Sequence, residues 1–212
     1  MLWFTSDHHF GDEKVRLYRM RPFENVDEMN AALLKSWNDH IAPDDKVFHL
    51  GDFAATDEAL EEFAPQLNGH IRLILGNHDL SRPRELLQEY FEILDGPVKY
   101  KFNQDRLFLC HYPKQRPNPE TSDIYTICGH IHDLFKVARR MVNVGVDAWH
   151  FKPVSLEQIL NCRESEQLGR WDANVYPDAP LDWQWKVSNI QERSGQEPTI
   201  PILMREMQER KA

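Results

Sequence analysis

The amino-acid sequence predicts an α/β protein with two β-sheets and helices packed against them. Short apolar runs of strand length alternate with helical runs over the first half of the chain, which is typical of parallel strands joined by crossover helices. From about Pro97 the strand-like runs follow one another with little room for helices, so the second half is expected to be mostly β. With 41% hydrophobic and 28% charged residues among 212, the chain can bury a substantial core.

The first half is expected to contain three strands and three helices in alternation, and the second half five strands and a helix. Ser155 can cap that last helix through its hydroxyl. In the first half the strands are Leu2–Ser6, Lys46–Leu50 and Ile71–Leu75, and the helices are Val26–Ile41, Asp57–Leu67 and Arg84–Phe91. In the second half the strands are Val98–Phe102, Arg106–Cys110, Ile124–Cys128, Phe135–Ala138 and Met141–Val146, and the helix is Ser155–Leu160.

The chain divides into a folded domain, residues 1–165, and an extension, residues 166–212. Trp171, Trp183 and Trp185 lie among prolines in the extension, which indicates an irregular arm that packs through aromatic anchors and ends in a polar helix near Met204–Arg210. The apolar stretch Ile200–Met204 favours contact with protein. We therefore expect the arm to pack on the core or on a second subunit of a homo-oligomer.

Charge and composition limit the classes of function. The net charge of −9 speaks against a protein that coats nucleic acid through a basic surface. No apolar run approaches the ~18–20 residues that cross a bilayer, and residues 1–10 do not resemble a signal peptide, so no contact with a membrane is expected. Three cysteines without a CxxC spacing favour a reducing compartment. The expected location is the cytoplasm.

Side chains suited to metal binding follow five of the predicted strands. Because ligands bind outside the carboxyl ends of strands in α/β sheets, all five segments can converge. Asp, His and Asn without cysteine favour Mn²⁺, Fe²⁺ or Zn²⁺. Seven ligands are too many for one ion, whereas two ions sharing a bridging carboxylate can clamp a phosphoryl group. The segments are Asp7-His8-His9, Gly51-Asp52, Gly76-Asn77-His78-Asp79, His111 and Gly129-His130-Ile131-His132.

These five segments, in this order, resemble those of the calcineurin-like metallophosphoesterase family, in particular its small bacterial or phage-type members. The resemblance spans Met1 to roughly Ser165. It implies a two-sheet β-sandwich flanked by helices (α/β/β/α, metallo-dependent phosphatase-like). It also implies two divalent metal ions, with manganese first and iron, zinc or nickel as alternatives. One ion would be held by Asp7, His9 and His132, the other by Asn77, His111 and His130, and Asp52 would bridge them.

His78 is the residue that the family uses near the leaving group, and Asp79 could orient it. A histidine between a carboxylate and two metals can protonate an alkoxide leaving group. The expected function is a phosphodiesterase that uses a metal-bridging hydroxide with His78 as general acid. Gly51-Asp52 is not followed by the Asp-Arg-Gly of the protein phosphatases. A phosphomonoesterase, a nucleotide pyrophosphohydrolase and a non-catalytic scaffold remain alternatives.

Basic residues follow the ligand segments and could attract an anionic substrate such as a nucleotide or a nucleic acid held only at the metal centre. Four of them are candidates for substrate binding: Arg16, Arg19, Arg21 and Arg82. Cys110 and Cys128 flank ligand segments and are expected to fill the core. His8, which lies between two expected ligands, is expected to face away from the metals.

Overall fold

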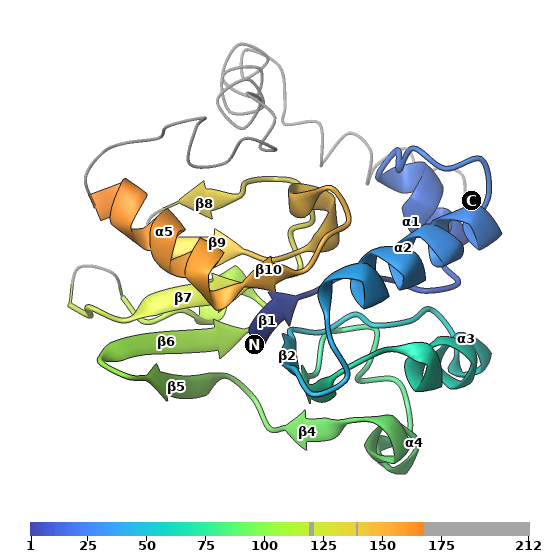
Figure 1. The fold of residues 1–212 in the computed structure, drawn as a ribbon, viewed down its shortest axis with the longest axis horizontal. Coiled ribbons are helices and arrows are strands. Elements are labelled where there is room, and N and C mark those ends of the chain that lie inside the picture. The colour runs from blue at the N-terminus through green and yellow to red at the C-terminus, as the bar shows by residue number, and fades with distance from the viewer. Residues whose placement is uncertain (119–120, 139, 168–212) are drawn as a thin grey trace, which may run out of the picture. The chain divides into compact units, whose positions relative to one another are not determined.

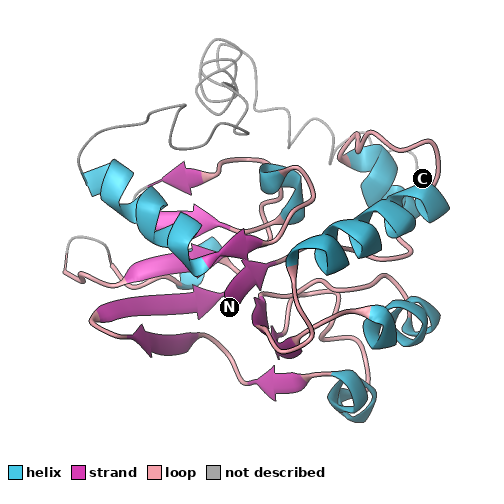
Figure 2. Cartoon of the chain, in the orientation of Figure 1, coloured by secondary structure: helices cyan, strands magenta, loops and turns pink. Residues whose placement is uncertain are grey.

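The computed structural model describes residues 1–118, 121–138 and 140–167. Within these residues the chain forms two five-stranded sheets, and helices pack against them (Figures 1 and 2). The strand orders are β10-β1-β2-β3-β4 and β5-β6-β7-β9-β8. The predicted two-sheet α/β class is therefore confirmed. Nearly all of the extension, with its three tryptophans and its expected terminal helix, lies outside the described residues, so the predicted arm stays a prediction.

The first sheet is parallel except at one edge. Its parallel strands are β1 (Leu2–Thr5), β2 (Lys46–His49), β3 (His70–Ile74) and β4 (Glu92–Leu94), and β10 (Val154–Ser155) pairs antiparallel with β1. The sequence pattern missed β4 and β10 because edge strands of three and two residues are too short to show a period.

Helices α2 (Val26–His40), α3 (Asp57–Phe63) and α4 (Arg84–Tyr90) connect these strands. Asn25 and Thr56 cap α2 and α3 by accepting bonds from backbone N–H groups in the first turn. The predicted helix to Leu67 ends as the 3₁₀ turn η1 (Ala64–Gln66), because Pro65 lacks an N–H and its ring clashes with the preceding turn. A short polar helix, α1 (Glu13–Tyr18), was not predicted, since none of its residues is buried.

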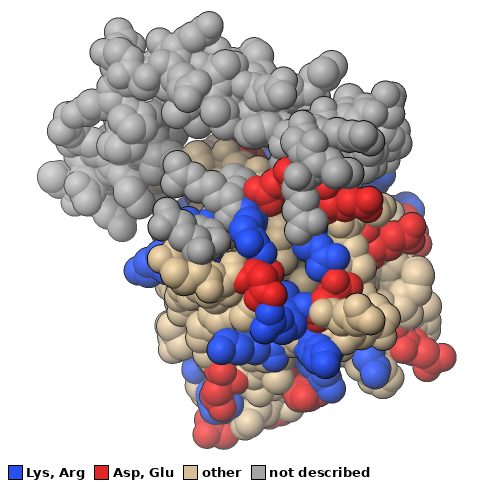
Figure 3. Space-filling view, turned by 90° about the vertical axis from the view of Figure 1, so that its left-hand side faces the viewer, with Lys and Arg blue, Asp and Glu red and all other residues tan. Residues whose placement is uncertain are grey.

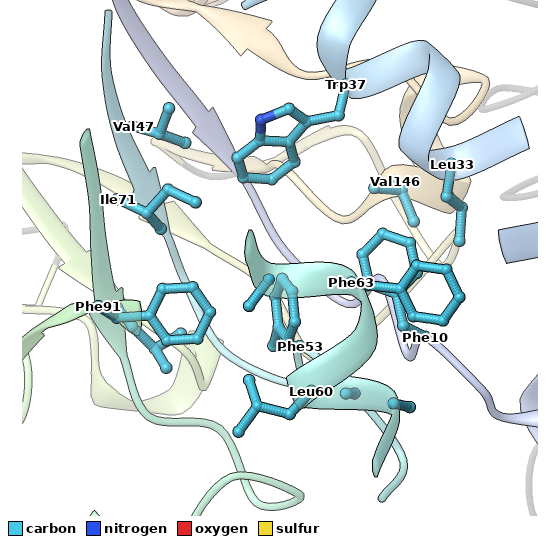
Figure 4. Close-up of a cluster of buried hydrophobic side chains, with 14 of the residues drawn as sticks. Phe10, Leu33, Trp37, Val47, Phe53, Leu60, Phe63, Ile71, Phe91 and Val146 are labelled. Atoms are coloured by element: carbon cyan, nitrogen blue, oxygen red, sulfur yellow. The ribbon is translucent and has the colours of Figure 1, made fainter. Parts of the chain in front are cut away.

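The main hydrophobic core lies between the first sheet and these helices (Figure 4). On α2, the buried residues Met29, Leu33 and Trp37 recur every four positions and form one face. Aromatic rings fill the centre, and the stacked rings of Phe10 and Phe63 have centroids 4.8 Å apart. Buried side chains of this core therefore hold the loops that follow β1 and β2 in place.

The second sheet is mixed. It contains β5 (Val98–Phe102), β6 (Asp105–Cys110), β7 (Tyr125–Cys128), β8 (Val137–Ala138) and β9 (Met141–Asn143), followed by the 3₁₀ turn η3 (Val146–Trp149). Strands β6, β7 and β9 are parallel, and β5 and β8 are antiparallel to their neighbours. A bridge between Ser6 and Gly145 ties the end of β1 to the segment after β9. The carboxyl ends of β1 and β9 are thereby brought together.

After β10 comes α5 (Leu156–Gln167), which contacts β9 and β10. The predicted Ser155 cap is present, because the Ser155 hydroxyl accepts a bond from the Gln158 N–H. Among the described residues, no helix is both long enough and apolar enough to cross a membrane.

Candidate metal centre

Loops from both sheets bring the predicted ligand side chains to one place. Three groups of potential ligand atoms have all their members within 4.8 Å of one another. The groups are Asp7, His9 and His132; His9, Asp52 and His78; and Asp52, His111 and His130. Two groups share His9 and two share Asp52, so the three form one continuous cluster. Their role as metal ligands stays a prediction.

The backbone at this cluster is strained. Five predicted ligands adopt left-handed conformations that L-residues rarely occupy. Their φ angles are 60° at Asp7, 53° at His9, 59° at Asp52, 73° at His130 and 51° at His132. Such conformations cost of order 1–3 kcal/mol each and persist where the surrounding structure enforces them, as it does at functional sites. These conformations therefore lower the stability of the fold while they direct the five side chains into the cluster.

Two glycines permit the close approach of the loops. A Cβ atom at Gly76 would lie 2.2 Å from Asp52 Oδ1, and one at Gly129 would lie 2.0 Å from Ser6 Oγ. Neither backbone position could carry a side chain without displacing a loop of the cluster. The glycines that precede Asn77 and His130 are thus required by packing.

One half of the cluster, defined by Asp7, His9 and His132, is fully buried. The rings of His9 and His132 stack with centroids 5.2 Å apart. Nδ1 of His132 lies 2.7 Å from Asp147 Oδ2, so this nitrogen carries the proton and Nε2 is left as the free electron-pair donor. Neither ring nitrogen of His9 has a hydrogen-bond partner among the described residues, although Asp12 lies 3.6 Å from its Nδ1.

The other half, defined by Asn77, His111 and His130, is more open, because Asn77 is exposed and His130 is partly exposed. His111 Nε2 lies 3.3 Å from Asn77 Oδ1 and 3.2 Å from His130 Nδ1. Its Nδ1 lies 2.6 Å from the Leu50 carbonyl oxygen, which can only accept, so Nδ1 is protonated and Nε2 faces the cluster.

Asp52 lies between the two halves. Its Oδ2 is 3.6 Å from His9 Nε2 and 3.4 Å from His111 Nε2, and its Oδ1 accepts a bond from the His78 N–H. Burial opposes ionisation of Asp52, but the bond and charge of His111 outweigh it, so its pKa lies well below the usual range. Burial likewise opposes the charge of His111, yet Asp52 and Asp7 raise its pKa to about 9. Without a metal ion, the ionised Asp52 and the protonated His111 therefore stabilise each other.

The donor set fits a divalent ion. The orphaned nitrogens of buried His9 are a desolvation cost that a metal ion would relieve. Carboxylate, imidazole and amide oxygen or nitrogen atoms are ligands for borderline or hard divalent metals. The thiols of Cys110 and Cys128 are buried, and burial raises the pKa of Cys110 to about 12, so neither supplies a thiolate.

His78 and Asp79 have different surroundings. The partly exposed His78 ring lies edge-on to His9, with centroids 4.6 Å apart. The buried Asp79 carboxylate accepts bonds from the backbone N–H groups of Asp52, Phe53 and Gly76, at 2.7, 3.1 and 2.8 Å. Its contacts thus join the loops of Asp52 and Asn77, and the expectation that Asp79 also orients the His78 ring stays a prediction.

The four candidate arginines all contact protein groups. Arg16 bonds to Glu13 and to the Phe23 carbonyl, and Arg19 lies 4.0 Å from Asp133. Arg21 is buried and bonds to Asp147 and to the carbonyls of Asp7 and His8. Arg82 bonds to the carbonyls of His78 and Ala54 and pairs with Asp57. Substrate binding by these residues stays a prediction.

Basic residues elsewhere are interspersed with acidic ones. Figure 3 shows Lys and Arg beside Asp and Glu on the described surface at the side where α5 and the turn between β5 and β6 lie in Figure 1. Two ion pairs of this region are Arg163–Asp105 and Arg106–Asp123. This face is therefore mixed in charge, unlike a uniformly basic surface for nucleic acid.

Several residues around the cluster were not singled out in the sequence. Asp147 follows a predicted strand, as the ligands do, and this position was the available signal for it. Asp12 offered no signal beyond its place at a helix start. Tyr112 contacts the open half, with its ring centroid 4.5 Å from that of His130. His8 faces the core as expected, where it stacks on Phe10 and bonds to His49.

Comparison with known proteins agrees with this geometry. The sequence profile of the calcineurin-like phosphoesterase superfamily domain matches residues 2–161. The uncharacterized protein MJ1445 of Methanocaldococcus jannaschii is 31% identical over 184 residues, covering 80% of this chain and 94% of that protein. The gene 66 protein of Mycobacterium phage L5 is 29% identical over 181 residues, covering 69% and 86%.

A solved structure is also similar. The protein of unknown function AQ665 from Aquifex aeolicus superposes with a TM-score of 0.58 at 25% identity, covering 79% of this chain and 98% of that one. The match of the family profile covers far more than half of the chain and includes all five ligand segments. The chain therefore belongs to the calcineurin-like phosphoesterase superfamily, a family of metal-dependent hydrolases.

Proposed function

We propose that this phosphoesterase is a phosphodiesterase with two divalent metal ions, manganese being the first candidate. The observation that carries the proposal is the single cluster in which Asp52 lies between the ring nitrogens of His9 and His111. Asp7, His9 and His132 would hold one ion, Asn77, His111 and His130 the other, and Asp52 both. A carboxylate with one oxygen within 3.6 Å of a donor from each half is suited to a bridging role.

Bound metal ions would supply charge neutralisation for the phosphoryl oxygens and a more acidic water. The chain itself places the polar groups of the site, of which Asp7, His9 and His132 are buried. His78 is the only cluster histidine outside the six predicted non-bridging ligands, and its partial exposure lets its ring reach a substrate. We assign it the donation of a proton to the leaving-group oxygen, a role worth about 10²–10⁴-fold in rate.

A diester is favoured by the segment after Asp52. Phe53 and Ala54 are buried, and the Ala54 carbonyl accepts a bond from Arg82. No cationic side chain belongs to residues 53–57, the place where the protein phosphatases carry their phosphate-binding arginine. A diester, with one negative charge, needs less positive charge for binding than a monoester, and it has a poor leaving group that requires a proton donor.

The experiment that tests the proposal is a substrate panel. Metal-stripped protein is reloaded separately with Mn²⁺, Fe²⁺, Zn²⁺, Ni²⁺ or Mg²⁺ and assayed with bis-p-nitrophenyl phosphate, p-nitrophenyl phosphate, a dinucleoside pyrophosphate, cyclic nucleotides and single-stranded oligonucleotides. We expect kcat/KM to be highest for a diester with Mn²⁺. A higher value for p-nitrophenyl phosphate or for the pyrophosphate would favour the alternative enzymes, and no hydrolysis with any metal would favour the scaffold.

Two further proposals accompany this function. Nucleotides or nucleic acids are the substrate class that the oligonucleotide and cyclic-nucleotide assays address. The three cysteines of the sequence have no CxxC spacing, which supports the proposal of a reducing location such as the cytoplasm.

A further inference from the structure

Arg21 and Asp147 form a buried ion pair beside the candidate metal centre, although they lie 126 positions apart in the sequence. Arg21 Nε is 2.8 Å from Asp147 Oδ1, and Arg21 Nη2 is 2.9 Å from Asp147 Oδ2. The side chains are 0% and 6% exposed. Two parallel bonds of this kind fix the planes of both groups against each other.

The remaining polar atoms of the pair contact the buried half of the centre. Arg21 Nη1 donates to the His8 carbonyl and Nη2 to the Asp7 carbonyl, both at 2.7 Å. Asp147 Oδ2 accepts from His132 Nδ1 at 2.7 Å. The ion pair thus connects the backbone of the Asp7–His9 segment to the ring of His132, and these segments carry all three non-bridging ligands predicted for one metal.

A buried ion pair is weak evidence for stability, because the desolvation of two charges offsets much of their attraction. The three hydrogen bonds with Asp7, His8 and His132 give this pair a more specific consequence. His132 and Asp7 adopt strained left-handed backbones, so their orientation needs enforcement from outside the loops. The pair supplies that enforcement from the segment before α2 and from η3.

We infer that Arg21 and Asp147 are positioning residues that aim His132 Nε2 and the Asp7 carboxylate at the same metal ion. This inference rests on the metal centre of the proposed function. Asp147 holds the His132 proton on Nδ1, and Arg21 holds Asp147 in place while it fixes the Asp7 backbone. The two residues act through ligands and do not touch substrate.

The first test uses wild-type protein without metal. In ¹⁵N NMR of the histidine rings, His132 should show a single neutral tautomer with the proton on Nδ1 at a pH where it is uncharged. The Asp147→Asn variant should show a mixture of tautomers, since an amide can either accept from or donate to the ring. A wild-type His132 with its proton on Nε2 would overturn the inference, whatever the behaviour of the variant.

The second test measures metal binding with Cd²⁺ as the probe, by calorimetry and ¹¹³Cd NMR. Loss of a hydrogen bond to a ligating histidine typically costs 10–100-fold in metal affinity. We expect that loss in Asp147→Asn for one Cd²⁺, whereas Asp133→Asn, which alters the partly exposed carboxylate next to His132, should bind like wild type. Arg21→Lys keeps the charge and part of the bonding, so its loss should be smaller than that of Asp147→Asn.

The outcomes separate the two proposals. Equal Cd²⁺ affinities in wild type and Asp147→Asn would overturn the positioning role even if the enzyme hydrolyses diesters. A wild type that binds Cd²⁺ with the expected difference between variants, yet hydrolyses no diester with any metal, would support the positioning role and contradict the proposed function.

Discussion

The two halves of the candidate centre are built in different ways. Asp7, His9 and His132 are buried, with the carboxylates of Asp12 and Asp147 beside His9 and His132. Asp147 is in turn held by Arg21, which lies 126 positions away in the sequence. In the other half Asn77 is exposed, and His111 is backed by a backbone carbonyl. The buried half therefore depends on a charged side-chain pair that the fold brings together, whereas the open half is held through a main-chain carbonyl and leaves room for a substrate.

The largest effect should come from the residue common to both halves. Asp52→Asn removes the charge between His9 and His111, so we expect both metals to bind poorly and kcat/KM to fall by at least about 10³-fold, equivalent to several kcal/mol of lost metal-assisted stabilisation. Metal content and hydrolysis of bis-p-nitrophenyl phosphate measure this. Asp44→Asn, at an exposed position before β2, is the matched control and should behave like wild type. Full metal content with normal turnover in Asp52→Asn would exclude a bridging role.

His78 contacts the buried half through His9 but is partly exposed like the open half. His78→Ala should lower kcat by about 10²–10⁴-fold for diesters with basic leaving groups and much less for those that release p-nitrophenol. Metal affinity should stay near that of wild type. If activated and unactivated esters lose the same factor, His78 does not act as the proton donor, and a drop in metal content would instead make it a ligand.

The buried half also rests on a neutral histidine pair. His49 Nδ1 accepts from the Gly51 N–H, so its Nε2 carries the proton and donates to His8 Nδ1 at 2.9 Å. Burial, aided by the charges of His111 and His9 and opposed by Asp52, lowers the pKa of His49 to about 3. Burial, with the neighbouring His49 and Arg21, lowers the pKa of His8 as well. During acidification, the folded protein therefore binds these protons only at a lower pH than the unfolded chain does.

The sign of the pH effect follows from this order. Below about pH 6.5 the side chain of His49 is protonated in the unfolded chain, whereas in the folded protein it stays neutral until about pH 3. The free energy of unfolding should thus fall with acidification across this window, by up to about 1.4 kcal/mol per pH unit from His49 alone. Urea unfolding of metal-free His49→Gln between pH 6.5 and 4 should show a shallower slope. His70→Gln, at an exposed site on β3, should keep the wild-type slope, and identical slopes in all three proteins would refute the account.

The smallest effect is expected at the open half. The Tyr112 hydroxyl lies 3.5 Å from Asn77 Oδ1, which is the limit of a hydrogen bond. Tyr112→Phe keeps the ring against His130 and removes only this contact, so metal affinity should change by less than about threefold. Calorimetry with Cd²⁺ alongside Asp147→Asn gives the comparison. A larger loss in Tyr112→Phe than in Asp147→Asn would reverse the proposed difference between the halves.

The sequence predicted the segments of the expected ligands but not the contacts that hold these segments in place. Strand-length apolar runs that end in Asp, Asn or His predicted the segments of all seven expected ligands, because both the pattern and the ligand are local. His8 could be placed on the core side from its position between Asp7 and His9. The pairing of Arg21 with Asp147 could not be predicted from the sequence, because a guanidinium near a ligand segment could face either a substrate or a buried carboxylate 126 positions away.

The sequence by itself determined the α/β class, the order of the ligand segments and the chemistry of their side chains, since these depend on residue type and on periods of a few residues. Only the tertiary structure decided which group stands behind each ligand. Pairing of Arg21 with Asp147, and of the Leu50 carbonyl with His111, requires the two sheets to bring their strand ends together. The left-handed backbones at Asp7 and His132 also depend on that packing, because this conformation is uncommon even for Asp and His and is strained unless the surrounding structure enforces it.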